Sequence, residues 1–259
     1  MMKKLRAISM NKEFIVNDKY LDAMHIALSD KTRLLANEGT IRSQKTVSMI
    51  QAFFELVQDS KEVLHMISAE NLDAIRDNIL KSDFGLEVCY PEYIRRRKEE
   101  FGGYYLEVKC DLPGRPTIKR VLLVGFGNSS QWKKINGKTL GVVFIDEVNM
   151  ADMQFVRESL ARQTSADNPK TLWTLNGDIP THEIYTELIN RCKIISRTTT
   201  PASIRADMDK VDKENGWYYL HWNMKDNPDM TPKKIKEAYA LFPPGSYYYT
   251  IKILGERGA

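Results

Sequence analysis

Short apolar runs alternate along this chain with longer stretches in which apolar residues recur every three or four positions. The short runs have the length of buried strands and cover residues 32–36, 63–67, 120–124, 142–145, 170–175 and 192–196. Residues 104–109 alternate between apolar and polar, as a half-buried strand does. Strands that alternate with helices predict an α/β fold, with a mostly parallel central sheet flanked by helices.

Helical spacing is clearest directly after the first strand, where Val47, Ile50, Phe54 and Val57 share one face. An earlier helix is expected where Tyr20, Leu21, Met24 and Leu28 recur. Further helices are expected over residues 152–162, 204–211 and 232–239.

Residues 83–120 are less regular. A short helix is expected from Pro91, and it would carry the basic run Arg95-Arg96-Arg97-Lys98. Such a run has two interpretations of equal weight: a solvated helix face, or a contact with nucleic acid or another partner.

The composition changes near residue 213, where the aromatic run from Trp217 to Trp222 begins. Aromatic side chains beside basic ones can stack on nucleic-acid bases, but such a cluster is more often the core of a small subdomain, which we favour. We therefore expect a core over residues 1–212 and a small C-terminal lid subdomain over residues 213–259.

The stretch with the most specific chemistry runs from Gly39 to Thr46 and reads Gly-Thr-Ile-Arg-Ser-Gln-Lys-Thr. It nearly fits the phosphate-binding pattern G-x-x-x-x-G-K-[ST], in which backbone N–H groups cradle phosphates. Lys45 would reach the β- and γ-phosphates, and Thr46 would bind Mg²⁺. Gln44 stands where the pattern has its second glycine, so taken alone the match also allows an ordinary strand-to-helix loop.

Two carboxylates, Asp146 and Glu147, follow the apolar run 142–145. Ligands of open α/β sheets bind beyond the carboxyl ends of the strands. There Asp146 can hold Mg²⁺, and Glu147 can orient and deprotonate an attacking water. A strand that simply ends in polar residues is the alternative, and the phosphate loop makes it the weaker one.

The strand at 170–175 leads into a polar segment that runs from Thr174 to His182. Thr174 and Asn176 can touch both the γ-phosphate region and a moving element, so they are candidates for coupling hydrolysis to motion. The segment is also rich in residues that favour turns, which is its simpler interpretation.

Composition narrows the class of protein only modestly. The 259 residues are 42% hydrophobic and 28% charged, with a net charge of +4, which is compatible with a polyanionic partner. Three scattered cysteines suggest a reducing compartment and form no metal-ligand pattern. The basic start is followed by no apolar signal segment, so we expect an intracellular protein without a membrane segment.

Taken together, these motifs resemble the N-terminal ATPase domain of the bacteriophage terminase large subunit, over nearly the whole chain. Gly39 to Thr46 resembles that family's Gly-Gly-Ile-Arg-Ser-Gly-Lys-Thr loop, including the arginine before the serine. Val143 to Glu147 matches its Walker B strand and catalytic glutamate, and Leu175 to His182 resembles its coupling segment, with Gly177 in place of a proline. Residues 226–228 and 247–256 resemble its lid and the run into a nuclease domain.

The resemblance implies an ASCE-type P-loop NTPase that hydrolyses ATP with Mg²⁺ and translocates double-stranded viral DNA into a procapsid. It assigns catalysis to Lys45, Arg42 and Glu147, nucleotide binding to the loop, metal binding to Thr46 and Asp146, and coupling to Thr174 and Asn176. The nucleotide-binding residues are Gly39, Thr40, Ile41, Arg42, Ser43, Gln44, Lys45 and Thr46. The implied partners are double-stranded DNA, a portal protein, a small terminase subunit and further copies in a ring on the portal. The isolated chain would be a monomer in the host cytoplasm.

Two other functions stay open at this point. One is another DNA-dependent P-loop ATPase of helicase type, and the other is a nucleotide-binding scaffold whose hydrolysis is impaired by Gln44. The family's nuclease half has no counterpart after Glu147, so we expect no nuclease activity and a truncated chain.

Overall fold

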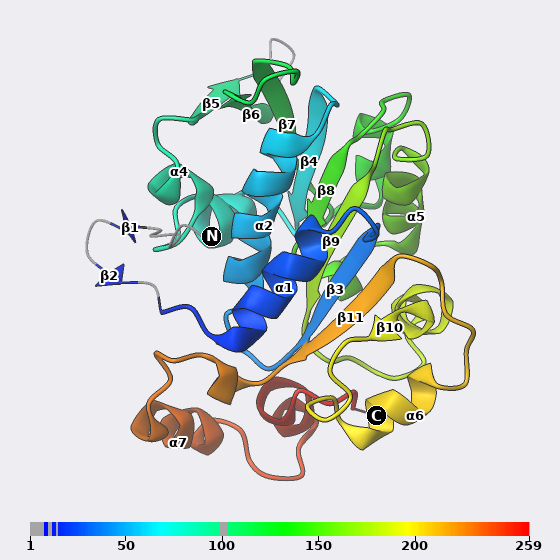
Figure 1. Cartoon of the computed structure of the whole chain (residues 1–259). Coiled ribbons are helices and arrows are strands. Elements are labelled where there is room, and N and C mark those ends of the chain that lie inside the picture. The colour runs from blue at the N-terminus through cyan, green and yellow to red at the C-terminus, as the bar shows by residue number, and fades with distance from the viewer. Residues whose placement is uncertain (1–7, 10–11, 14, 99–102, 259) are drawn as a thin grey trace.

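The computed structural model describes residues 8–9, 12–13, 15–98 and 103–258. A nine-stranded sheet with the order β10-β11-β3-β9-β8-β4-β7-β6-β5 forms its centre, and a two-stranded sheet joins β1 to β2 (Figure 1). The strands are β1 Ile8–Ser9, β2 Lys12–Glu13, β3 Leu34–Gly39, β4 Leu64–Ala69, β5 Ile94–Lys98, β6 Tyr104–Lys109, β7 Ile118–Gly125, β8 Val142–Ile145, β9 Lys170–Leu175, β10 Lys193–Ile194 and β11 Trp217–Trp222.

The strands from β10 to β7 pair in parallel, whereas β6 is antiparallel to both of its neighbours. The α-helices are α1 Asp18–Leu28, α2 Lys45–Asp59, α3 Leu72–Ala74, α4 Leu86–Cys89, α5 Met153–Ala161, α6 Ala202–Met208 and α7 Pro232–Ala240. Short π and 3₁₀ turns are η1 Ile75–Leu80, η2 Ser129–Lys134, η3 Val148–Met150, η4 Ile184–Leu188, η5 Ile189–Arg191, η6 Met224–Asp226 and η7 Tyr249–Leu254. The predicted α/β fold with a mostly parallel sheet is confirmed.

Both faces of the sheet are covered, which is the usual state of parallel strands. Side chains of successive strand residues point to opposite faces: Leu35 packs in one core with α1 and α2 residues, and Leu34 and Ala36 pack in the other with α5. Figure 1 shows α1 and α2 in front of the sheet and α5 on the other side. This arrangement brings the loop between β3 and α2 to the carboxyl edge of the sheet.

Two expectations from the sequence need correction. Residues 95–98 do not lie on a helix but on the edge strand β5, because each pairs with a residue of β6 across an antiparallel ladder. The aromatic run 217–222 is not the core of a separate subdomain: β11 pairs in parallel with β3 inside the central sheet. The expected boundary between residues 212 and 213 therefore separates β11 from the sheet to which it belongs. The elements that follow β11 in the chain are η6, α7 and η7.

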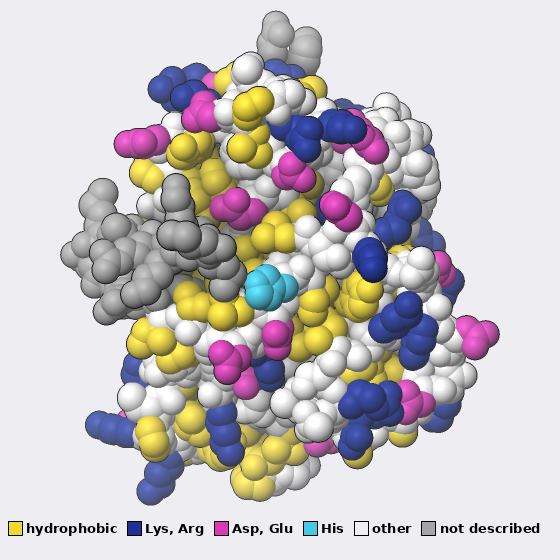
Figure 2. Space-filling view, in the orientation of Figure 1, with side chains coloured by type: hydrophobic (Ala, Val, Ile, Leu, Met, Phe, Trp, Pro, Cys, Tyr) yellow, Lys and Arg dark blue, Asp and Glu magenta, His cyan; other side chains and the backbone are white. Residues whose placement is uncertain are grey.

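Basic and acidic side chains are interspersed over the face of the molecule that α1 occupies (Figure 2). The net charge of +4 therefore does not gather into a single patch on that face. None of the described helices combines the length and the apolar character needed to cross a bilayer.

A buried histidine in β4 makes the stability of this fold sensitive to acid. His65 is fully buried, and its Nδ1 accepts a hydrogen bond from the Val142 N–H at 3.0 Å while its Nε2 lies 3.1 Å from the Glu62 carbonyl oxygen. Burial, with help from the charge of Lys119, lowers the pKa of His65 to about 3. Both ring nitrogens are thus satisfied by the neutral imidazole, which would lose the Val142 bond on protonation.

We expect the free energy of unfolding to fall as the pH drops from 6.5 towards 3. In that range the unfolded chain binds a proton at His65 that the native chain does not, so the slope is about 1.4 kcal/mol per pH unit for this one group. Urea unfolding at a series of pH values measures it. His65→Gln should have a shallower slope by about that amount, and replacement of the exposed His25 by Gln is the control. Equal slopes for wild type and His65→Gln would contradict the assignment.

Candidate nucleotide site at the carboxyl edge of the sheet

The loop from Gly39 to Thr46 connects β3 to α2. Its first residues are held by backbone contacts with β11 and η7. Gly39 has a φ of +155°, and a Cβ on it would come within 1.9 Å of the Trp222 carbonyl oxygen. The Thr40 N–H donates to that same oxygen at 3.0 Å, and the Ile41 N–H donates to the Lys252 carbonyl at 3.2 Å. Only glycine fits at position 39, because β11 passes so close to it.

Gln44 adopts the backbone conformation that the motif's glycine usually supplies. Its φ of 72° and ψ of 8° are left-handed, and it directly precedes the first residue of α2. Arg42 is also left-handed, with a φ of 55°. A non-glycine residue held there costs on the order of 1–3 kcal/mol. The loop therefore keeps the turn of a phosphate loop at the expense of strain at Gln44.

We expect Gln44→Gly to preserve or improve ATP binding and to raise the melting temperature, because glycine relieves this strain. Gln44→Ala is the matched variant, since it removes the amide but keeps the Cβ. The Gln44 Oε1 is buried and has no hydrogen-bond partner among the described residues, so the amide could instead be a ligand. Titration of ATP into all three proteins decides: weaker binding by both variants would make Gln44 a positive contact.

Lys45, the first residue of α2, is buried and points across the loop. Its ammonium donates to the Thr40 carbonyl at 3.1 Å and to the Asn176 Oδ1 at 2.7 Å. Burial lowers the pKa of Lys45 to about 8, against the opposing attraction of Glu147 and Asp146. The side chain is thus a poorly solvated cation at the carboxyl edge, where a phosphate would stabilise its charge.

Asp146 follows β8 and is held by two hydroxyl groups. The Thr46 Oγ1 donates to its Oδ1 at 3.2 Å, and the Thr174 Oγ1 donates to the same oxygen. Burial raises the pKa of Asp146, and these two hydrogen bonds oppose that shift. The Thr46 hydroxyl and the Asp146 carboxylate are hard oxygen ligands placed side by side, and Mg²⁺ in nucleotide sites takes few protein ligands beside phosphate oxygens and waters. The residues present therefore fit Mg²⁺.

Glu147 comes next along the chain and has a left-handed φ of 55°. Its backbone N–H donates to the Thr174 Oγ1 at 3.2 Å, and its Oε1 accepts a hydrogen bond of 2.7 Å from the Asn176 Nδ2. The amide of Asn176 thus accepts from Lys45 through its oxygen and donates to Glu147 through its nitrogen. One side chain at the end of β9 joins the end of the loop to the carboxylate after β8.

The structure brings six of the predicted site residues into one connected set of hydrogen bonds: Lys45, Thr46, Asp146, Glu147, Thr174 and Asn176. Arg42 is outside this set, because its side chain is exposed and has no hydrogen bond or ion pair with any described residue. Its carbonyl, however, accepts a hydrogen bond of 2.7 Å from the Asn227 Nδ2.

A cavity opens beside the loop, and part of its lining was not predicted. Besides residues 42–47 it is lined by Ser82, Asp83, Phe84, Asn227 and Asp229. Residues 82–84 follow η1 and carry no recognisable motif. The turn at 226–228 was visible in the sequence, but its position over the loop depends on the path of the chain after β11.

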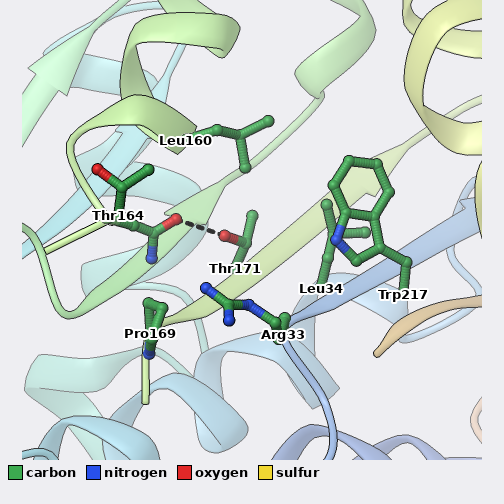
Figure 3. Close-up of a pocket in the computed structure, with 8 residues that line it drawn as sticks. Arg33, Leu34, Leu160, Thr164, Pro169, Thr171 and Trp217 are labelled. Carbon is green, nitrogen blue, oxygen red and sulfur yellow. Dashed lines mark hydrogen bonds between the residues drawn. The ribbon is translucent and has the colours of Figure 1, made fainter. Parts of the chain in front are cut away.

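A second pocket lies at the opposite edge of the sheet, at the amino ends of β3 and β9 (Figure 3). Arg33, Leu34 and Trp217 line one side of it, and Leu160, Thr164 and Pro169 lie opposite, with Thr171 between them. The Thr171 hydroxyl donates to the Gln163 Oε1 at 2.6 Å. No predicted site residue lines this pocket, so it is separate from the candidate nucleotide site.

No family model and no curated protein matches this chain. Solved structures do match it in fold. The large terminase of a thermophilic bacteriophage in complex with ADP is similar over 93% of this chain, with a TM-score of 0.71 and 20% identity. The same protein in complex with ATP-γ-S has a TM-score of 0.70 and 20% identity. This chain spans about half the length of those structures, 53% and 52% respectively.

The ATPase domain of the large terminase from Thermus phage P74-26 is similar over nearly the whole of both chains. The match covers 93% of this chain and 98% of that one, with a TM-score of 0.63 and 15% identity. The chain therefore has the fold of the large-terminase ATPase domains.

Proposed function

We propose that this chain hydrolyses ATP and uses the free energy to translocate double-stranded DNA into a viral procapsid, as the motor domain of a large terminase. The observation that carries this proposal is the Asn176 amide, which joins Lys45 of the loop to Glu147 at the carboxyl edge. The similar large terminase of the thermophilic bacteriophage binds ADP and ATP-γ-S, which supports a nucleotide as the ligand.

In the proposed reaction, Lys45 compensates the charge of the β- and γ-phosphates, and Arg42 turns from solvent onto the γ-phosphoryl group. Thr46 and Asp146 would hold Mg²⁺, which would supply positive charge beside the phosphate oxygens. Glu147 orients the attacking water and accepts its proton. The nucleoside half of ATP would extend from the loop into the cavity lined by Phe84, Asn227 and Asp229.

Coupling follows from the two bonds of Asn176. A bound γ-phosphate competes with the Asn176 Oδ1 for Lys45, because an ammonium pairs more strongly with an anion than with a neutral amide. Asn176 then keeps its bond to Glu147 alone, and Thr174 stays fixed to Asp146. Asn176 therefore changes its contacts with nucleotide state, while Thr174 keeps the end of β9 attached to Asp146. These are the coupling roles that we assign to the two residues.

The other parts of the proposal follow from the resemblance. We place the lid after β11, in residues 223–258, rather than from residue 213 as the sequence suggested. The proposed partners are double-stranded DNA, a portal protein, a small terminase subunit and further copies of this chain in a ring. The protein would work in the host cytoplasm, would be a monomer in isolation and would not itself cut DNA.

The decisive experiment is ATP turnover by the purified chain, measured with and without linear duplex DNA. We expect turnover that rises with duplex, does not separate its strands and disappears in Lys45→Ala, which loses the partner of the phosphate charge. Stimulation by single strands with strand separation would favour the helicase-type alternative. Tight ATP binding without turnover would favour the nucleotide-binding scaffold.

A further inference from the structure

The C-terminal segment after η7 carries a buried ion pair that reaches the base of the phosphate loop. The Arg257 and Glu38 side chains are 1% and 0% exposed, and the Arg257 Nη2 lies 3.0 Å from the Glu38 Oε2. The Arg257 Nε also donates to the Glu38 Oε1 at 3.2 Å. Glu38 directly precedes Gly39, so this pair fixes the last side chain before the loop begins.

Arg257 has two further partners in the segment after β9. Its Nη1 donates to the Asn190 Oδ1 at 2.7 Å, and its guanidinium carbon lies 3.8 Å from the centre of the Tyr185 ring. The Tyr185 hydroxyl in turn lies 3.5 Å from the Asn176 carbonyl oxygen. One guanidinium therefore connects the strand before the loop to the element that supports Asn176.

The backbone on either side of Arg257 lies against the segment after β9. A Cβ on Gly177 would come within 2.2 Å of the Glu256 carbonyl oxygen, so this position needs glycine where the resembled family has proline. The Gly258 N–H donates to the Asp178 carbonyl at 3.1 Å. Figure 1 shows this C-terminal stretch at the carboxyl edge of the sheet, below β3 and β11.

Stability alone does not account for such a pair. The desolvation of two buried charges can outweigh their attraction, and well-packed apolar residues of similar volume are often as stable or more stable. A fixed geometry is the other use of a buried ion pair. Here the fixed geometry is the relative position of the end of β3 and the segment after β9. Asn176 needs that position in order to bond to both Lys45 and Glu147.

We propose that Arg257 is a positioning residue for ATP hydrolysis, acting through Glu38 on the phosphate loop and through Tyr185 on Asn176. This inference rests on the proposed function for its kinetic consequence. Because misplacement by about 1 Å can cost on the order of 10²-fold in rate, loss of Arg257 should lower kcat by roughly that factor. KM for ATP should change little, since the loop and Lys45 remain.

The test compares Arg257→Met, Glu38→Gln and the double variant Glu38→Gln/Arg257→Met. Arg257→Met leaves an uncompensated buried carboxylate and should melt well below the wild type. The double variant removes both charges and should regain much of that loss, yet keep the low kcat. Arg257→Lys should recover part of kcat. Arg197→Met, which breaks an exposed pair with Asp209, is the matched control and should leave kcat unchanged.

A double variant that is stable and turns over at the wild-type rate would overturn the proposal, because the pair would then be structural only. A wild-type chain that does not hydrolyse ATP would contradict the proposed function instead. Amide hydrogen exchange over residues 38–47 separates the two outcomes, since it needs no hydrolysis. We expect faster exchange at Thr40 and Ile41 in the stable double variant than in wild type, and equal exchange there would overturn the positioning role.

Discussion

Replacing Glu147 by glutamine is expected to lower ATP turnover by roughly 10²–10⁴-fold, which is the usual contribution of a general base. The glutamine can still accept the Asn176 N–H at its Oε1, as the carboxylate does at 2.7 Å, so the local geometry should survive. What it cannot do is take a proton from the attacking water. Binding of ATP with Mg²⁺ should therefore be retained.

Single-turnover hydrolysis and calorimetric titration with ATP–Mg²⁺ measure the two quantities separately. Glu237→Gln is a suitable control, because that carboxylate is exposed and its one ion pair among the described residues is with Lys233. A Glu147→Gln chain that hydrolyses ATP at the wild-type rate would remove Glu147 from the catalytic role. Loss of binding as well as of rate would mean that Glu147 holds the nucleotide site together.

Much of the fold could be predicted because its signals are local. The runs at 142–145 and 170–175 are strands with the expected bounds, and the loop with its following helix lies where the motif places it. The backbone conformation of Gln44 also follows from the local motif. The motif requires a left-handed residue at the position of its second glycine, and Gln44, which stands there, has a φ of 72°. Patterns of this kind depend on neighbours a few residues away.

The errors concern features that depend on distant segments. The run 95–98 is rich in charge and follows Pro91, yet pairing with β6 makes it a strand. The aromatic run 217–222 gave no sign of its partner, which is β3 about 180 residues earlier and lies beside it in the sheet. Arg257 and Glu38 are separated by almost the whole chain. A glutamate at the end of an apolar strand was the available signal that a buried cation must lie nearby.

The candidate site was predictable as a set of residues, but its connections were not. Motif spacing identified Lys45, Asp146 and Asn176 without saying which atoms meet. Sequence cannot show that one amide serves both Lys45 and Glu147, because that depends on the order of β3, β9 and β8 in the sheet. The same order explains why three separate segments converge at one edge.

The second large effect concerns assembly: turnover per chain should rise as chains are brought together. Phosphoryl transfer of this type gains roughly 10³–10⁵-fold from an arginine finger supplied in cis or by a neighbour. Arg42 could act in cis, while Arg95, Arg120, Arg157 and Arg162 are the candidates to act across subunits. In the ring proposed above, each site would lie next to another copy.

The structure ranks these four arginines. Arg95 and Arg120 both lie opposite Glu107 in the sheet, and Arg120 pairs with Leu64 at the amino end of β4, far from the phosphate loop. Arg162 is also at the amino edge, because its carbonyl accepts the Leu140 N–H just before β8.

Arg157 lies closer to the carboxyl edge, on the part of α5 that faces η4. It is half exposed and pairs with Glu183 and Glu187. Pairs between exposed charges are weak, so Arg157 can be released to a neighbouring site. It is therefore the first candidate for a finger that acts in trans.

Mixing two variant chains, each with low turnover on its own, tests whether Arg157 acts in trans. A Lys45→Ala chain has an inactive nucleotide site but keeps Arg157. An Arg157→Ala chain keeps an intact nucleotide site but lacks the arginine finger. Each should be slow alone, and the mixture should regain turnover as concentration rises, since the first chain completes the site of the second. Arg162→Ala, at the residue that caps the C-terminal end of α5, removes the same charge and should behave as wild type. Turnover that stays high and constant down to concentrations where the chain is a monomer would exclude a finger in trans and leave Arg42 as the charge on the γ-phosphoryl group.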